Sequence, residues 1–144
     1  MKTTIRVAGI WISYRKVLLE SLADREVWGM PGGNLSDGES LEEGCQREYR
    51  EETGIEITCI RLALVHEHFW QDDGSPVREY GFYFVVVPTN VSDGSGAEVK
   101  SLEGHLTFRW FDLGELPRIE FVPKPIRQSL AELGTHTVFV STRE

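Results

Sequence analysis

The sequence predicts an α+β fold in which a mixed β-sheet is flanked by helices. Segments typical of strands and helices follow one another as strands, helix, strands, helix, without the regular alternation of a doubly wound sheet. The chain has 144 residues, of which 40% are hydrophobic and 26% are charged. This size and composition are typical of one globular domain with its own core. We therefore expect residues 1–144 to form a single domain.

The N-terminal part of the chain is predicted to be extended. Segments 4–14 and 16–22 are rich in β-branched, aliphatic and aromatic residues, a composition that favours strands. Segment 27–33 also looks extended, because Pro31 disfavours helix in the residue before it and the glycine pair that follows permits an unusual backbone path.

A helix is predicted to follow and to end at about Thr53. Asp37 or Ser40 can cap its N-terminus, and Ser40 with Glu43 matches the S-x-x-E capping box. Gly54 supplies the glycine that commonly follows the last helical residue.

The second half of the chain returns to strands. Segments 55–70 and 78–89 are long and extended, and the turn-forming residues between them predict a hairpin. The remaining segments are predicted to be a polar loop, a strand, a helix and a last short strand (90–104, 105–113, 123–134 and 135–142).

Charge and composition exclude several classes of function. The net charge of −8 argues against nucleic acid as a partner, because such a surface needs clustered Lys and Arg. Small phosphorylated substrates stay open, since a bound cation can invert the local field. The two cysteines, Cys45 and Cys59, form no CxxC pair and fit free thiols in a reducing compartment. No segment has the length and apolarity of a signal peptide or membrane span, so we expect a cytoplasmic protein without membrane contact.

Three glutamates of the predicted helix indicate a metal site. Glu48, Glu51 and Glu52 are spaced i, i+3 and i+4, which places them on one helix face. Adjacent anions are unfavourable without a positive charge between them, and oxygen ligands suit Mg²⁺ or Mn²⁺. The alternative, with equal weight, is a solvated face of a glutamate-rich helix. Gly33 could let the backbone approach a metal or phosphate closely, or could simply form a tight turn.

The stretch GNLSDGESLEEGCQREYREETGI, residues 33–55, resembles the Nudix box of the MutT-like pyrophosphohydrolases, G-x5-E-x7-R-E-U-x-E-E-x-G-U, where U is apolar. Every fixed letter is present: Gly33, Glu39, Arg47, Glu48, Glu51, Glu52 and Gly54. Tyr49 occupies an apolar position at which the family prefers a smaller aliphatic residue. The resemblance implies the α/β/α sandwich of the Nudix fold.

The resemblance also implies an activity. Members of the family hydrolyse a diphosphate bond in a nucleoside diphosphate linked to another moiety and release a nucleoside monophosphate, using Mg²⁺ or Mn²⁺. The substrate stays open among nucleoside triphosphates (including oxidised ones), ADP-ribose, nucleotide sugars and dinucleoside polyphosphates. Two other readings are a non-catalytic nucleotide-sensing module on the same fold and an acidic helix that binds a protein. The resemblance also allows a homodimer.

The resemblance assigns roles to the box residues. Glu48, Glu51 and Glu52 match the metal-binding glutamates, joined by a backbone carbonyl at Gly33 or its neighbour Gly32. Arg47 and Glu39 match a supporting ion pair, although Arg47 could also form an ordinary helical pair with Glu51. The catalytic set is then Arg47, Glu48, Glu51 and Glu52, together with a base from the box or from a later loop.

The box pattern does not identify the catalytic base or the substrate-binding residues. Glu103 is our first candidate for the base and a further metal ligand, and Glu98 is the second; either could be a solvated loop carboxylate. Phe69 and Trp70 could stack on a nucleobase and Arg78 could meet a phosphate, whereas alternating strand aromatics more often pack in a core. His66 and His68 share a strand face, where we expect half-exposed histidines rather than a metal pair.

Overall fold

Within the part of the chain that the structure describes, the strands form two mixed sheets of five strands each. The structure is a computed structural model that describes residues 1–22, 25–92 and 98–144. The first sheet has the order β10 (Val138–Arg143), β6 (Ile57–Asp72), β7 (Ser75–Pro88), β1 (Lys2–Ile10) and β5 (Gly32–Asn34). The second contains β2 (Ile12–Ser13), β3 (Lys16–Leu22), β4 (Val27–Gly29) and β9 (Glu120–Phe121), with β8 (Leu106–Asp112) paired to β3.

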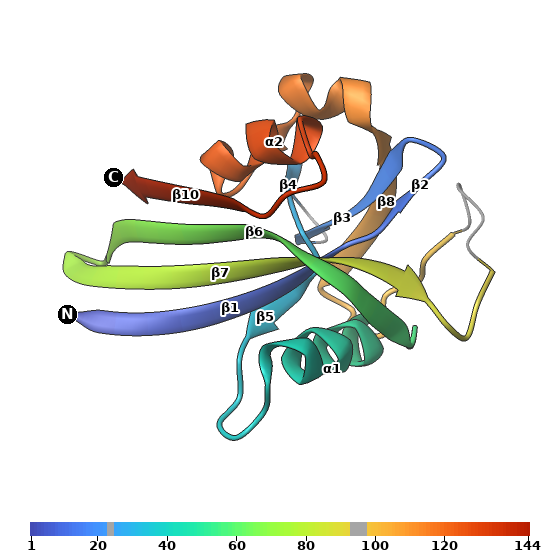
Figure 1. The fold of residues 1–144 in the computed structure, drawn as a ribbon, viewed down its shortest axis with the longest axis horizontal. Coiled ribbons are helices and arrows are strands. Elements are labelled where there is room, and N and C mark those ends of the chain that lie inside the picture. Colours follow the sequence, from blue (N-terminus) through green and yellow to red (C-terminus); the bar gives the residue numbers. More distant parts are fainter. Residues whose placement is uncertain (23–24, 93–97) are drawn as a thin grey trace.

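Helices lie on opposite sides of these sheets (Figure 1). Helix α1 (Leu41–Thr53) packs on β1, β5, β6 and β7. Helix α2 (Lys124–Ala131) packs on β9, β10 and the 3-10 helix η1 (Leu113–Arg118) on the other side. The predicted α+β fold is confirmed, with its strands divided between two sheets rather than placed in one.

The sheets are buried on both faces, which gives the protein two cores. Successive side chains of a strand point to opposite faces. In β1, Val7 belongs to the core beneath α1 and Ala8 to the core beneath α2. In β3, Leu18 belongs to the α1 core, whereas Leu19 belongs to the α2 core. Strands covered on both sides explain the nearly continuous apolar runs of the sequence.

The ends of α1 are set by local side-chain chemistry. Ser40 Oγ accepts the Glu43 N–H at 3.1 Å, and Glu43 Oε1 accepts the Ser40 N–H at 2.8 Å. At the other end, Gly54 adopts the left-handed conformation with φ 74°. The predicted capping box and C-terminal glycine are therefore confirmed, and with them the position of the glutamates along the helix.

The hairpin of β6 and β7 is confirmed and is longer than predicted. Its turn lies at Asp73 and Gly74, which both have positive φ. Residues 93–97 of the predicted loop 90–104 lie outside the described residues. None of the described helices is both long and apolar enough to cross a membrane.

Candidate active site

The glycine pair of β5 lies directly beneath α1. β5 pairs with β1 so closely that a Cβ atom on Gly32 would lie 2.1 Å from the Val7 carbonyl oxygen. A Cβ atom on Gly33 would lie 2.5 Å from Oε1 of Glu48. The strand pairing therefore requires glycine at Gly32, whereas a side chain at Gly33 would displace the Glu48 carboxylate that packs against its backbone.

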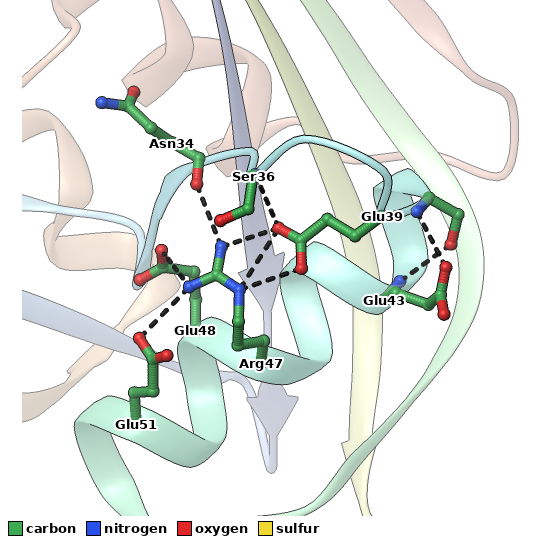
Figure 2. A network of polar contacts seen from close by, with 8 residues as sticks. Asn34, Ser36, Glu39, Glu43, Arg47, Glu48 and Glu51 are labelled. Carbon is green, nitrogen blue, oxygen red and sulfur yellow. Dashed lines mark hydrogen bonds and ion pairs between the residues drawn. The ribbon is translucent and has the colours of Figure 1, made fainter.

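Arg47 organises the outer side of this site. Its guanidinium donates to Glu39 in a bidentate pair, with Nη2–Oε1 at 2.7 Å and Nε–Oε2 at 2.9 Å. The Nη1 atom donates to Glu48 Oε1 at 3.1 Å and to Glu51 Oε2 at 3.2 Å. Figure 2 shows Arg47 between Glu39 on one side and Glu48 with Glu51 on the other. Arg47 Nη2 also donates to the Asn34 carbonyl at 3.1 Å, which connects this arrangement to the end of β5.

The Arg47–Glu39 pair stays ionised over a wide pH range. Hydrogen bonds from Arg47 and from the Ser36 N–H lower the pKa of Glu39 to about 2. The hydrogen bond with Glu39 raises the pKa of Arg47 above its usual value. Both side chains are therefore charged near neutral pH, so Arg47 can hold the neighbouring carboxylates in place.

The three helix glutamates lie in different environments. The Glu51 side chain is 51% exposed and is held by Arg47. Glu52 is 3% exposed and points into the protein. Glu48 is intermediate in exposure, with 15% of its side chain exposed. The glutamates that the box pattern predicts as one group are therefore divided into two inward carboxylates and one outward carboxylate.

A fourth carboxylate, Glu20 of β3, contacts Glu52. Its Oε1 atom accepts the Gly32 N–H at 3.1 Å and lies 3.9 Å from Nη2 of Arg6. Burial and the adjoining Glu20 carboxylate raise the pKa of Glu52 well above its usual value, and burial raises the pKa of Glu20. Glu20 was not predicted from the sequence as a site residue. The available signal was a lone acid inside the apolar strand KVLLESL, two residues after Leu18, which faces the α1 core.

The loop before β8 brings Glu103 toward the same place. The Leu102 N–H donates to the Glu52 carbonyl at 2.7 Å, which docks the loop on the end of α1. The negative charge of Glu103 contributes to the raised pKa of Glu52, and its Oε2 lies 3.5 Å from Nε2 of His105. Glu98, the second candidate, is exposed. This geometry favours Glu103 over Glu98.

A cavity of about 620 Å³ opens beside Glu20. Its lining includes Arg6, Glu20, Trp28, Met30, Trp70 and Tyr83. Trp70 therefore lies where a substrate could contact it. Phe69 and Arg78 are not among the lining residues: the Arg143 guanidinium lies over the Phe69 ring at 4.1 Å, and Arg78 donates to Thr3 Oγ1 at 3.2 Å.

The two histidines of β6 are buried, and the expectation that they are half-exposed was wrong. His66 and His68 are 2% and 8% exposed, and both contact Thr142 Oγ1, at 2.6 and 2.9 Å. The reason is the parallel pairing of β10 with β6, which covers this stretch and which the sequence did not indicate.

The donors near Glu52 fit a hard divalent cation. Glu52 Oε1 and Glu20 Oε2 are buried and have no hydrogen-bond partner within the part of the chain that the structure describes. Within that same part, no three His, Cys, Asp or Glu side chains already enclose a common point for a metal. Glu48, on the same helix, is held at one oxygen by Arg47, whose Nη1 donates to Oε1 at 3.1 Å. Carboxylate and backbone oxygens of this kind are what Mg²⁺ and Mn²⁺ prefer.

Comparison with known proteins finds related sequences. The NUDIX domain matches residues 4–133. The uncharacterized Nudix hydrolase YvcI of Bacillus subtilis is 34% identical over 112 residues, which cover 75% of this chain and 65% of YvcI. The 8-oxo-dGDP phosphatase NUDT18 of Danio rerio is 36% identical over 110 residues, which cover 73% of this chain and 30% of NUDT18. The chain thus spans less than two-thirds of either relative.

A solved structure shows the same fold. The crystal structure of the mutator MutT protein of Bacillus halodurans superposes with a TM-score of 0.74 at 22% identity, covering 97% of this chain and 89% of that one. The family match extends over nearly the whole chain and includes both α1 and the loop that carries Glu103. The chain belongs to the NUDIX domain family.

Proposed function

We propose that the protein is a cytoplasmic pyrophosphohydrolase that cleaves the diphosphate bond of a nucleoside diphosphate linked to another moiety, with Mg²⁺ as cofactor and Mn²⁺ as a substitute. The observation that carries the proposal is the buried oxygen of Glu52, which has no hydrogen-bond partner among the described residues and belongs to an intact set of box residues. The cavity beside Glu20 offers room for the rest of such a substrate.

Glu48 and Glu52 would hold the cation, together with a backbone carbonyl of Gly33 or Gly32. When bound, the cation supplies charge neutralisation at the diphosphate oxygens and makes a nearby water more acidic. Arg47 keeps Glu48 in place through its own pair with Glu39. Glu51 completes the acidic rim on the solvent side and can add a ligand if it leaves Arg47.

Glu103 is the proposed general base and a further ligand. Its loop is fixed to α1 by the hydrogen bond between Leu102 and Glu52, so the Glu103 carboxylate stays near the proposed cation site. A base needs to reach the attacking water within one hydrogen bond. Trp70, which lines the cavity, is the proposed stacking residue; Phe69 and Arg78 remain predictions from the sequence.

Chromatography of reaction products tests the proposal. A pool of nucleoside triphosphates (including oxidised ones), ADP-ribose, nucleotide sugars and dinucleoside polyphosphates is incubated with the protein in Mg²⁺, Mn²⁺ or EDTA. We expect release of a nucleoside monophosphate that EDTA abolishes and that Glu52→Gln reduces by about 100-fold or more. Glu42→Gln, a matched charge removal at an exposed position of α1, is expected to leave the rate unchanged.

Binding measurements separate the alternatives. Nucleotide binding without turnover would favour the sensing module on the same fold. Absence of both turnover and Mn²⁺ binding would overturn the proposed activity. The relative NUDT18, whose name gives 8-oxo-dGDP as its substrate, is the reason to include oxidised guanine nucleotides, as diphosphates and triphosphates, in the pool.

A further inference from the structure

Glu20 lies where the strand pattern calls for an apolar side chain. It follows Leu18 by two residues in β3 and therefore faces the same way, toward α1. Only 11% of its side chain is exposed. A buried carboxylate is costly unless it is paired or coordinates a metal. Arg6 is the cation in reach, and its Nη2 lies 3.9 Å away and donates at 3.2 Å to the Met30 carbonyl instead.

The partners of Glu20 place it between the helix and the cavity. One oxygen accepts the Gly32 N–H, which holds the carboxylate beside the glycine pair. The side chain adjoins Glu52, and it lies close enough to Glu48 for the negative charge of Glu48 to raise the pKa of Glu20. Glu20 also lines the cavity, whereas Glu48 and Glu52 do not. Among the described residues, Glu20 therefore lies both beside the carboxylates of α1 and in the lining of the cavity.

Each of the two adjoining carboxylates, Glu20 and Glu52, has one buried oxygen without a hydrogen-bond donor among the described residues. Oε2 of Glu20 and Oε1 of Glu52 have no partner among the residues that the structure describes. Glu52 is 97% buried, since only 3% of it is exposed. A contact between carboxylates requires a proton or a cation between them, and the adjoining Glu48 adds a further negative charge.

We infer that Glu20 is a direct ligand of the divalent cation held by Glu48 and Glu52, in addition to the glutamates of the box. This inference rests on the proposed function, because it assumes that a cation binds at Glu52. It adds a ligand from β3, outside the box, on the side of the site that faces the cavity. Glu20 would therefore fix the cation at the entrance through which the diphosphate arrives.

Mn²⁺ binding tests the inference without a substrate. Electron paramagnetic resonance of free Mn²⁺ gives the dissociation constant, and water proton relaxation gives the number of waters on the bound ion. We expect Glu20→Gln to weaken Mn²⁺ binding by about tenfold or more and to add one coordinated water. The glutamine oxygen can still accept the Gly32 N–H, so a role limited to positioning Gly32 predicts unchanged binding.

The controls separate this inference from the proposed function. Glu42→Gln removes the same charge from an exposed position and is expected to change the dissociation constant by less than twofold. Glu20→Asp keeps the charge on a shorter side chain and is expected to bind Mn²⁺ more tightly than Glu20→Gln. If the wild type binds Mn²⁺ and Glu20→Gln has the same dissociation constant, the inference about Glu20 is overturned and the proposed function is not. No Mn²⁺ binding by the wild type overturns both.

Thermal unfolding in EDTA and in Mn²⁺ provides a second readout. In EDTA, Glu20→Gln is expected to melt at or above the wild-type temperature, because it removes one of two buried carboxylates in contact. Saturating Mn²⁺ is expected to raise the melting temperature of the wild type by more than that of the variant. An equal gain in both proteins contradicts a ligand role for Glu20.

Discussion

Arg47 and Glu39 face each other across the start of α1 in a bidentate ion pair whose two shortest contacts are 2.7 and 2.9 Å. The remaining nitrogen of the guanidinium contacts Glu48 and Glu51. One planar group thus connects the loop before α1 to two of its carboxylates. A lysine cannot reproduce this geometry, because its ammonium is a single point of charge.

Arg47→Lys is expected to reduce kcat/KM by about 10- to 100-fold while the protein remains folded. The physical reason is that Glu48 loses the donor that holds it against Gly33. Steady-state kinetics with the substrate identified by the pool measures the effect. Arg50→Lys is the matched control, since Arg50 pairs with Glu56 at the surface. Equal rates for Arg47→Lys and Arg50→Lys would show that Arg47 only stabilises the helix.

Substitution of the two glycines of β5 is expected to affect different properties: metal binding and activity at Gly33, and stability at Gly32. Gly33→Ala places a methyl group against the Glu48 carboxylate, the flexible end of a side chain, which can move aside. We expect lost activity and weaker Mn²⁺ binding with little change in melting temperature. Gly32→Ala instead meets the Val7 backbone and is expected to lower the melting temperature by several degrees. Gly134→Ala, which meets no atom within 4 Å, is the control.

Tyr49 stabilises the packing of α1 on β1. Its hydroxyl donates to the Gly9 carbonyl at 3.1 Å in the buried α1 core, and its ring fills the space that the missing side chain of Gly9 leaves. Tyr49→Phe is expected to lower the free energy of unfolding by about 1 kcal/mol. Urea denaturation measures this change. Tyr14→Phe, at a side chain exposed to solvent, is expected to change it by less than about 0.5 kcal/mol.

His66 is expected to make stability depend on pH. Burial, with a smaller contribution from His68, lowers the pKa of His66 from 6.5 to about 4. Between these values the unfolded chain binds the proton more readily. The contribution of His66 to the free energy of unfolding is therefore fully present above about pH 6.5 and is lost as the pH falls toward 4. Urea denaturation at several pH values measures the slope. His66→Gln is expected to flatten it in this window, and an unchanged slope would assign it to other groups.

Much of the fold was predictable because its signals are local. The capping box of Ser40 and Glu43, the helix stop at Gly54 and the turn at Gly74 each act within a few residues. The three-residue strands β4 and β5 were not resolved by the sequence, since each is defined by a partner far along the chain. The division into two sheets has the same origin, because pairing between distant strands leaves no periodicity in either one.

The candidate site shows the same limit. The box pattern identified Glu48, Glu51 and Glu52, but their spacing could not show that Glu51 faces solvent and Glu52 is buried. That difference depends on Arg47 and on the packing of α1. Glu20 was missed because its partner Glu52 lies 32 positions later, and a single acid in a strand gives no motif.

The division into two cores has an evolutionary consequence. The buried side of α1 is anchored by Cys45 and Tyr49 in one core, whereas Trp28 and Tyr83, which line the cavity, belong to the other. Under the proposed function, selection can therefore change substrate preference without disturbing the packing that supports α1. A library randomised at cavity positions outside both cores, such as Arg25, Trp70 and Lys124, would test whether the substrate of the proposed hydrolase can be changed while the carboxylates of α1 stay in place.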